Sequence, residues 1–73
     1  MIQCHLSTLM GQRKMKIMDV ARATGLHRNT ISLLYKEEAA RIEVEAMDKL
    51  CRLFNCSVNE LFEYVPDEDS GTR

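Results

Sequence analysis

The chain has 73 residues, a formal net charge of −1 and 45% hydrophobic residues, which is the composition of a single small globular domain. It has no apolar stretch near the roughly 20 residues that span a bilayer, and its N-terminus lacks the order of a signal peptide. We therefore expect a cytoplasmic protein without a membrane partner. Its three cysteines include no C-x-x-C pair, which favours free thiols over a disulfide framework or a zinc site.

Charge is unevenly distributed along the chain. Residues 1–36 contain six basic residues and one acidic residue, whereas residues 37–73 contain four basic and ten acidic residues. Such asymmetry indicates a polyanionic partner on one side of the molecule. Chance clustering of surface charges is the alternative, so the charge pattern alone does not identify the partner.

Apolar residues recur at intervals of three and four along most of the chain, which is the spacing of helices with one buried face. The pattern predicts an all-α fold with helices over about 5–14, 17–24, 28–36 and 44–55 and a short fifth helix after residue 57. Gly25 supplies the left-handed backbone that ends the second helix. Ser57 and Glu60 form a capping box for the fifth helix. We expect these helices to bury Val20, Ala21, Leu26, Ile31, Leu34, Leu50 and Phe54 together.

The two ends of the predicted domain look extended rather than helical. Residues 1–4 and 63–65 show short stretches of alternating apolar side chains. They either pair as an antiparallel ribbon or fray as independent ends. Pro66 closes the predicted domain, which covers residues 1–66, and we expect the polar segment 67–73, DEDSGTR, to be flexible.

Residues 17–36, IMDVARATGLHRNTISLLYK, meet the requirements of two helices packed at a steep angle across a tight turn. Ala21 provides the small residue that the crossing point needs. Gly25 tolerates the positive φ of the turn, and Leu26 follows it as a core residue. Aliphatic residues then recur on one face of the second helix. The spacing therefore predicts a helix-turn-helix.

These residues resemble the helix-turn-helix of lambda-repressor-like regulators, the Cro-type or XRE family; the matching positions are Ala21, Gly25, Leu26, Ile31 and Leu34. The resemblance covers about residues 2–65, and the closing segment RLFNCSVNELFEY is similar to the end of compact single-domain members. It implies a five-helix domain that binds double-stranded DNA with its third helix, residues 28–36, in the major groove. It also implies a transcriptional regulator, in particular a repressor.

The third helix carries side chains that its apolar face does not use. Arg28 can read guanine and Asn29 can read adenine, and the resemblance places both where family members contact base edges. Leu33 either contacts a thymine methyl group or is an ordinary surface leucine. The remaining polar side chains can bind phosphates or bases. The full candidate DNA-binding set is Arg28, Asn29, Thr30, Ser32, Leu33, Lys36 and Arg41.

Four positions depart from the family pattern. Ile17 stands where many relatives have Gln, so only backbone contacts to phosphate carry over there. Glu37 and Glu38 follow the third helix where relatives have Asn-Gly and basic residues, and they should weaken binding to phosphates. His27 stands where relatives prefer a Ser cap; it is either a tolerated cap residue or a pH-sensitive phosphate contact.

The fourth and fifth helices carry more apolar residues than one small core can bury. Leu53 in particular lies off the main apolar line of the fourth helix. We therefore expect a homodimer through this end of the domain, as relatives commonly form; the alternative is a monomer that pairs only on DNA. The residues available for it are Val44, Met47, Leu53, Val58, Leu61, Phe62 and Tyr64.

Two other functional classes remain to be compared with DNA binding. The acidic second half and the Glu37–Glu38 pair are compatible with a protein-interaction module on the same fold, such as an antitoxin or an anti-repressor. An enzyme is not expected, because His5 and His27 have no partners at triad spacing and no Gly-rich phosphate loop is present. We likewise expect no cofactor, no metal and no small-molecule ligand.

Overall fold

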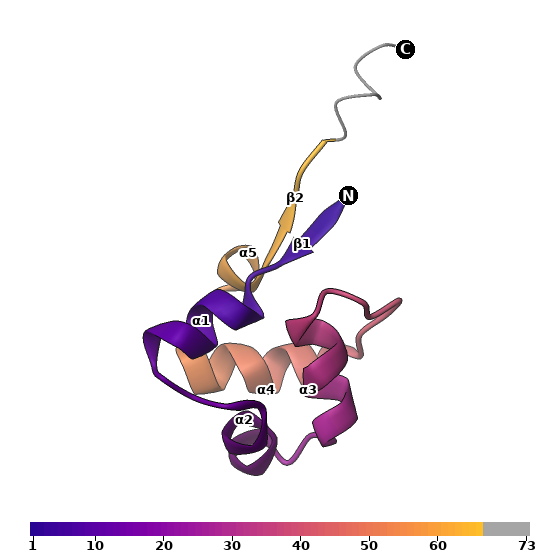
Figure 1. The fold of residues 1–73 in the computed structure, drawn as a ribbon. Coiled ribbons are helices and arrows are strands. Elements are labelled where there is room, and N and C mark those ends of the chain that lie inside the picture. The colour runs from indigo at the N-terminus through magenta and orange to yellow at the C-terminus, as the bar shows by residue number, and fades with distance from the viewer. Residues whose placement is uncertain (67–73) are drawn as a thin grey trace.

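The computed structural model of the protein describes residues 1–66, so the flexible tail expected over residues 67–73 lies outside the described residues. The described part contains five helices and a two-stranded sheet, which confirms the predicted fold. Figure 1 shows the ribbon leaving the helices at the end of the molecule opposite α2. In chain order the elements are β1 (Ile2–Cys4), α1 (Leu6–Gln12), α2 (Ile17–Thr24), α3 (Arg28–Tyr35), α4 (Val44–Phe54), α5 (Val58–Leu61) and β2 (Phe62–Tyr64).

The helix ends follow from local capping chemistry. Gly25 has a φ of 77° and ends α2 in the left-handed conformation, as predicted. Asn55, with a φ of 52°, does the same for α4 and shortens the predicted helix by one residue. At the start of α5 the Ser57 N–H donates to the Glu60 carboxylate at 2.8 Å, which confirms the capping box. α1 is shorter than predicted at both ends, because its flanking residues adopt cap conformations.

The two extended ends pair as an antiparallel ribbon rather than fraying. β1 and β2 align in the register Ile2–Tyr64, Gln3–Glu63 and Cys4–Phe62. Beyond the last pair, the Met1 amino group donates to the Val65 carbonyl at 2.7 Å, and the Val65 N–H donates to the Met1 carbonyl at 2.8 Å. The ribbon therefore brings the beginning and the end of the described chain together.

One core lies between the helices and under the base of the ribbon. It confirms five of the seven predicted core residues, whereas Ala21 and Leu26 are only half-buried and pack at its edge. These two residues stay partly exposed because the helix-turn-helix leaves the outer side of its own turn open to solvent. α1 and α5 supply buried residues as well. The core cluster consists of Leu6, Met10, Val20, Ile31, Leu34, Leu50, Phe54 and Leu61.

No helix within residues 1–66 is long and apolar enough to cross a membrane.

Candidate nucleic-acid interface

α2 and α3 form the predicted helix-turn-helix, and Thr24 at the end of α2 holds the turn. The Gly25 N–H donates to the Ala21 carbonyl at 2.8 Å. The Thr24 hydroxyl donates to the Val20 carbonyl at 2.8 Å and accepts the Leu26 N–H at 3.2 Å. The hydroxyl therefore ties the turn residue Leu26 to the last turn of α2. The sequence analysis did not single out Thr24, although threonine is common in such turn motifs.

His27 is the N-cap residue of α3. Its Nδ1 accepts the backbone N–H of Asn29 at 3.1 Å, so this nitrogen carries no proton and fills the role that a Ser oxygen usually has. The structure therefore shows His27 acting as a cap residue. The bond also fixes the first turn of α3, which carries Arg28 and Asn29.

Five of the seven candidate side chains share the outer face of α3. With about 100° between successive helical residues, this exposed face spans an arc of about 140°. Ile31 and Leu34 are buried on the opposite side. Leu33, with 36% of its surface exposed, lies at one margin of the arc. The residues of this exposed face are Arg28, Asn29, Ser32, Leu33 and Lys36, of which Ser32 is half-buried.

Thr30 and Arg41 lie apart from the exposed face. Thr30 is half-buried on the flank of α3. Together with Arg41, Ile42 and Glu43 it borders an open hollow of about 600 Å³ between α3 and the start of α4. The structure thus divides the candidate set into one face on α3 and a second, smaller group beside the loop that follows it.

Arg28 is oriented by a contact with α2. Its guanidinium lies 3.5 Å from the Met18 thioether sulfur, to which it donates a weak hydrogen bond. Met18 is half exposed, at 50%, and sequence periodicity did not select it. Shallow hollows on either side of this contact run along the surface between α2 and α3 and are bordered by Arg22, His27 and Asn29. Basic and polar groups of both helices therefore meet on one surface.

Two charged residues that contribute to the predicted charge pattern, Arg13 and Glu37, make their contacts away from this surface. The Arg13 guanidinium donates to the carbonyls of Leu53 and Phe54, both at 2.9 Å, at the end of α4. The Glu37 carboxylate accepts the backbone N–H of Cys4 at 3.0 Å and so faces the ribbon. One of the six basic residues counted in the first half is thus structural, and one of the two acids expected beside the phosphates is turned toward β1.

The thiols do not assemble a site. Cys4, Cys51 and Cys56 are free and half-buried, and the described residues contain no cluster of three or more metal-ligating side chains. Burial raises the pKa of the Cys4 thiol above its usual value, and the nearby Glu37 carboxylate adds to the shift. Burial likewise raises the pKa of the Cys56 thiol, beside Cys51. A raised pKa lowers the thiolate fraction of Cys4 and Cys56 at neutral pH, which is the opposite of the shift that reactive cysteines show.

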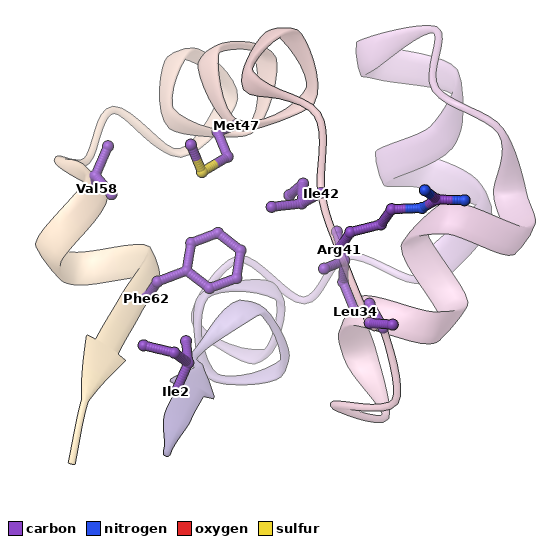
Figure 2. A pocket seen from close by; sticks show the side chains of 9 residues that line it. Ile2, Leu34, Arg41, Ile42, Met47, Val58 and Phe62 are labelled. Atoms are coloured by element: carbon purple, nitrogen blue, oxygen red, sulfur yellow. The ribbon is translucent and has the colours of Figure 1, made fainter. Parts of the chain in front are cut away.

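An apolar groove opens on the side of α4 that faces the ribbon. Figure 2 shows Met47 and Val58 beside Phe62 and Ile2, with the Arg41 side chain extending away from them. The groove has a volume of about 310 Å³. Val58 remains 50% exposed and Ile2 62% exposed at its rim. Apolar surface is therefore available at the end of the domain where the sequence predicted a second copy.

Comparison with known proteins agrees with this geometry. The family model of the Cro/C1-type helix-turn-helix DNA-binding domain matches residues 5–67. Since the match covers most of the chain, the protein belongs to this family of DNA-binding transcription regulators.

The sequence identity between this chain and individual similar proteins is low. The chain is 24% identical over 67 residues to YozG of Bacillus subtilis (strain 168), an uncharacterised HTH-type transcriptional regulator, and the match covers 92% of this chain and 80% of that protein. It is also similar to a crystal structure of a Bacteroides fragilis protein described as DNA-binding. That match has a TM-score of 0.74 and 17% identity, and it covers 86% of this chain and all of the other.

Proposed function

We propose that the protein is a sequence-specific repressor that binds an operator in double-stranded DNA as a homodimer, with residues 1–66 as its DNA-binding domain. The observation that carries the proposal is the exposed face of α3. A helix end that is fixed by the His27 cap presents Arg28 and Asn29 side by side. Arginine and asparagine are the side chains that form bidentate bonds with guanine and adenine in the major groove.

The other candidate residues have separate roles in this proposal. Ser32 and Leu33 lie farther along the same face, where they can contact a base edge or a thymine methyl group. Lys36 and Arg41 neutralise phosphates on either side of the groove, which raises affinity without selecting sequence. Thr30, on the flank of α3, contacts the backbone rather than a base. Repression follows from occupancy, because a bound dimer blocks access to the same DNA.

The dimer is supported by the surface opposite α2. Val44, Val58 and Tyr64 are 76%, 50% and 66% exposed, and the groove beside Met47 is open. Leu61, by contrast, is fully buried and belongs to the core, so it leaves the set expected to form the interface. A two-fold axis at this end would place the two α3 helices on one side of the assembly, about 34 Å apart, as successive major grooves require.

Selection of bound sequences from a random duplex pool tests the proposal. We expect two half-sites of related sequence separated by about one helical turn. A cytoplasmic location follows from the proposal, because the free thiols and the chromosomal target both belong there. A pool that shows no enrichment at low salt would contradict sequence-specific binding.

A protein-interaction role is the second candidate, and one observation favours it. Glu38 lies three residues beyond the end of α3 and is exposed. Such a charge repels phosphates. Affinity for random duplex measured against salt separates the two roles, because a DNA-binding protein shows a steep log–log slope and an interaction module does not.

A further inference from the structure

The second residue after α3 has an unusual backbone for its type. Glu37 has a φ of 58°. Its N–H donates to the Leu34 carbonyl at 3.1 Å, and the next N–H, of Glu38, donates to Leu33 at 2.8 Å. This is the hydrogen-bond pattern of a left-handed helix end, a position that glycine fills most easily. A side chain with a Cβ costs roughly 1–2 kcal/mol there, and an interaction of the glutamate side chain can offset that cost.

The Glu37 side chain supplies that interaction through the ribbon. Its Oε1 accepts the Cys4 N–H at 3.0 Å, between residues 33 apart in the chain. Hydrogen-bonded and non-hydrogen-bonded pairs alternate in an antiparallel ribbon. Because Met1 and Val65 exchange both of their bonds, the N–H of Cys4 points away from β2. The Glu37 carboxylate thus accepts a hydrogen bond from the outer edge of β1 at Cys4.

Apolar contacts surround the bond. A small hollow of about 90 Å³ between the ribbon and the end of α3 is bordered by Cys4, Leu34, Glu37 and Phe62. Leu34 belongs to the last turn of α3 and is buried in the core. The end of α3 and the base of the ribbon are therefore joined by both packing and a charge-assisted hydrogen bond.

We propose that Glu37 is a positioning residue, whose carboxylate fixes the orientation of α3 relative to the ribbon. The inference rests on the proposed function, since its effect is on how α3 meets DNA. The ribbon lies at the end of the domain where we propose that the second copy binds. By holding α3 in one orientation relative to the ribbon, Glu37 therefore also orients α3 relative to the proposed dimer interface. It thereby sets the distance and angle between the two α3 helices of the dimer. Specific binding depends on that geometry, whereas attraction to random duplex does not.

The test compares Glu37→Gln, which keeps an acceptor oxygen, with Glu37→Gly, which removes it and relaxes the backbone. Glu38→Gln and Glu38→Gly are matched controls one residue later. Hydrogen exchange of the Cys4 amide, followed by NMR, reports the bond itself. Affinity for a selected operator and for random duplex reports its effect on DNA. Thermal unfolding confirms that each variant is folded.

We expect Glu37→Gln to retain slow Cys4 exchange and a ratio of specific to random affinity within about twofold of the parent protein. Glu37→Gly should speed Cys4 exchange and lower operator affinity about fivefold, the effect of one lost hydrogen bond, while random affinity stays unchanged or rises. Because glycine suits the left-handed backbone, this loss should come without a lower unfolding temperature. The Glu38 variants should leave Cys4 exchange and the ratio unchanged.

Two results would overturn the proposal. Equal Cys4 exchange in the parent protein and in Glu37→Gly would show that the bond is not formed. A similar rise in affinity for both duplexes in Glu37→Gln, Glu37→Gly and Glu38→Gln would show that Glu37 is only a repelling charge. If the parent protein bound no duplex at all, the proposed function would fail together with the positioning role; operator binding without Cys4 protection would remove the positioning role alone.

Discussion

Arg13 closes the end of α4 by binding Phe54 in two ways. Its guanidinium donates to the Phe54 carbonyl at 2.9 Å and lies over the ring of the same residue, 5.6 Å from the centroid. A second bond of 2.9 Å reaches the Leu53 carbonyl. Carbonyls at a helix end lack intrahelical partners and carry partial negative charge, so one planar side chain satisfies two of them.

We expect Arg13→Ala to lower the free energy of unfolding by about 1–3 kcal/mol, because charge-assisted bonds and ring contact are lost together. Arg13→Lys should recover only part of this, since an ammonium cannot reproduce the fork. Urea denaturation monitored by circular dichroism measures both. Arg22→Ala, which removes only an exposed 4.0 Å ion pair with Asp19, is the control and should change stability by under about 0.5 kcal/mol.

His27 offers a test of the cap. His27→Ala should destabilise the protein by about 0.5–2 kcal/mol, because the Asn29 N–H loses its acceptor. His27→Ser should restore most of that stability. The same urea titrations give the answer, and equal losses for alanine and serine would mean that His27 contributes through something other than the cap.

The exposed face of α3 predicts two kinds of DNA variant. Arg28→Ala and Asn29→Ala should each cost about 1–3 kcal/mol on a selected site and relax base preference at one position. Lys36→Ala and Arg41→Ala should lower the affinity for all DNA sequences alike. Each should also reduce the slope of log affinity against log salt by about one. Repeating the selection with each variant distinguishes them. An unchanged sequence preference in Arg28→Ala would exclude Arg28 as a base reader.

The proposed dimer predicts that Val58→Glu weakens self-association, because a charge would enter the apolar surface around the groove. Val58 is a better choice than Leu53, which is half-buried against the core and would unfold the domain if charged. Sedimentation at tens of micromolar protein measures the effect, with Ser7→Glu on the exposed side of α1 as the control. A monomeric parent protein, with operator affinity unchanged in Val58→Glu, would contradict the dimer.

Local sequence chemistry was enough to predict most of the fold. Gly25 and the pair Ser57–Glu60 act within a few residues of their own positions, and the apolar spacing of α3 determines which side is exposed. The bonds from Arg13 to Phe54 and from Glu37 to Cys4 join residues 41 and 33 apart. Nothing in the neighbouring sequence signals such partners, so the sequence analysis counted Arg13 only as part of the basic half and expected Glu37 only to weaken phosphate binding. Long side chains can contact residues far away in the sequence, and the spacing of residues along one helix does not predict which ones.

The pairing of Met1 with Val65 has a consequence for the order of folding. It joins residues 64 apart, and closing such a long loop is entropically unfavourable until other contacts have shortened it. The helices contact one another at smaller separations, so we expect them to assemble first and the ribbon to close after the transition state. Gln3→Pro, which removes an N–H from the ribbon, should then speed unfolding and leave the folding rate nearly unchanged. Stopped-flow measurements in urea resolve the two rates, and a matching drop in the folding rate would place the ribbon in the nucleus instead.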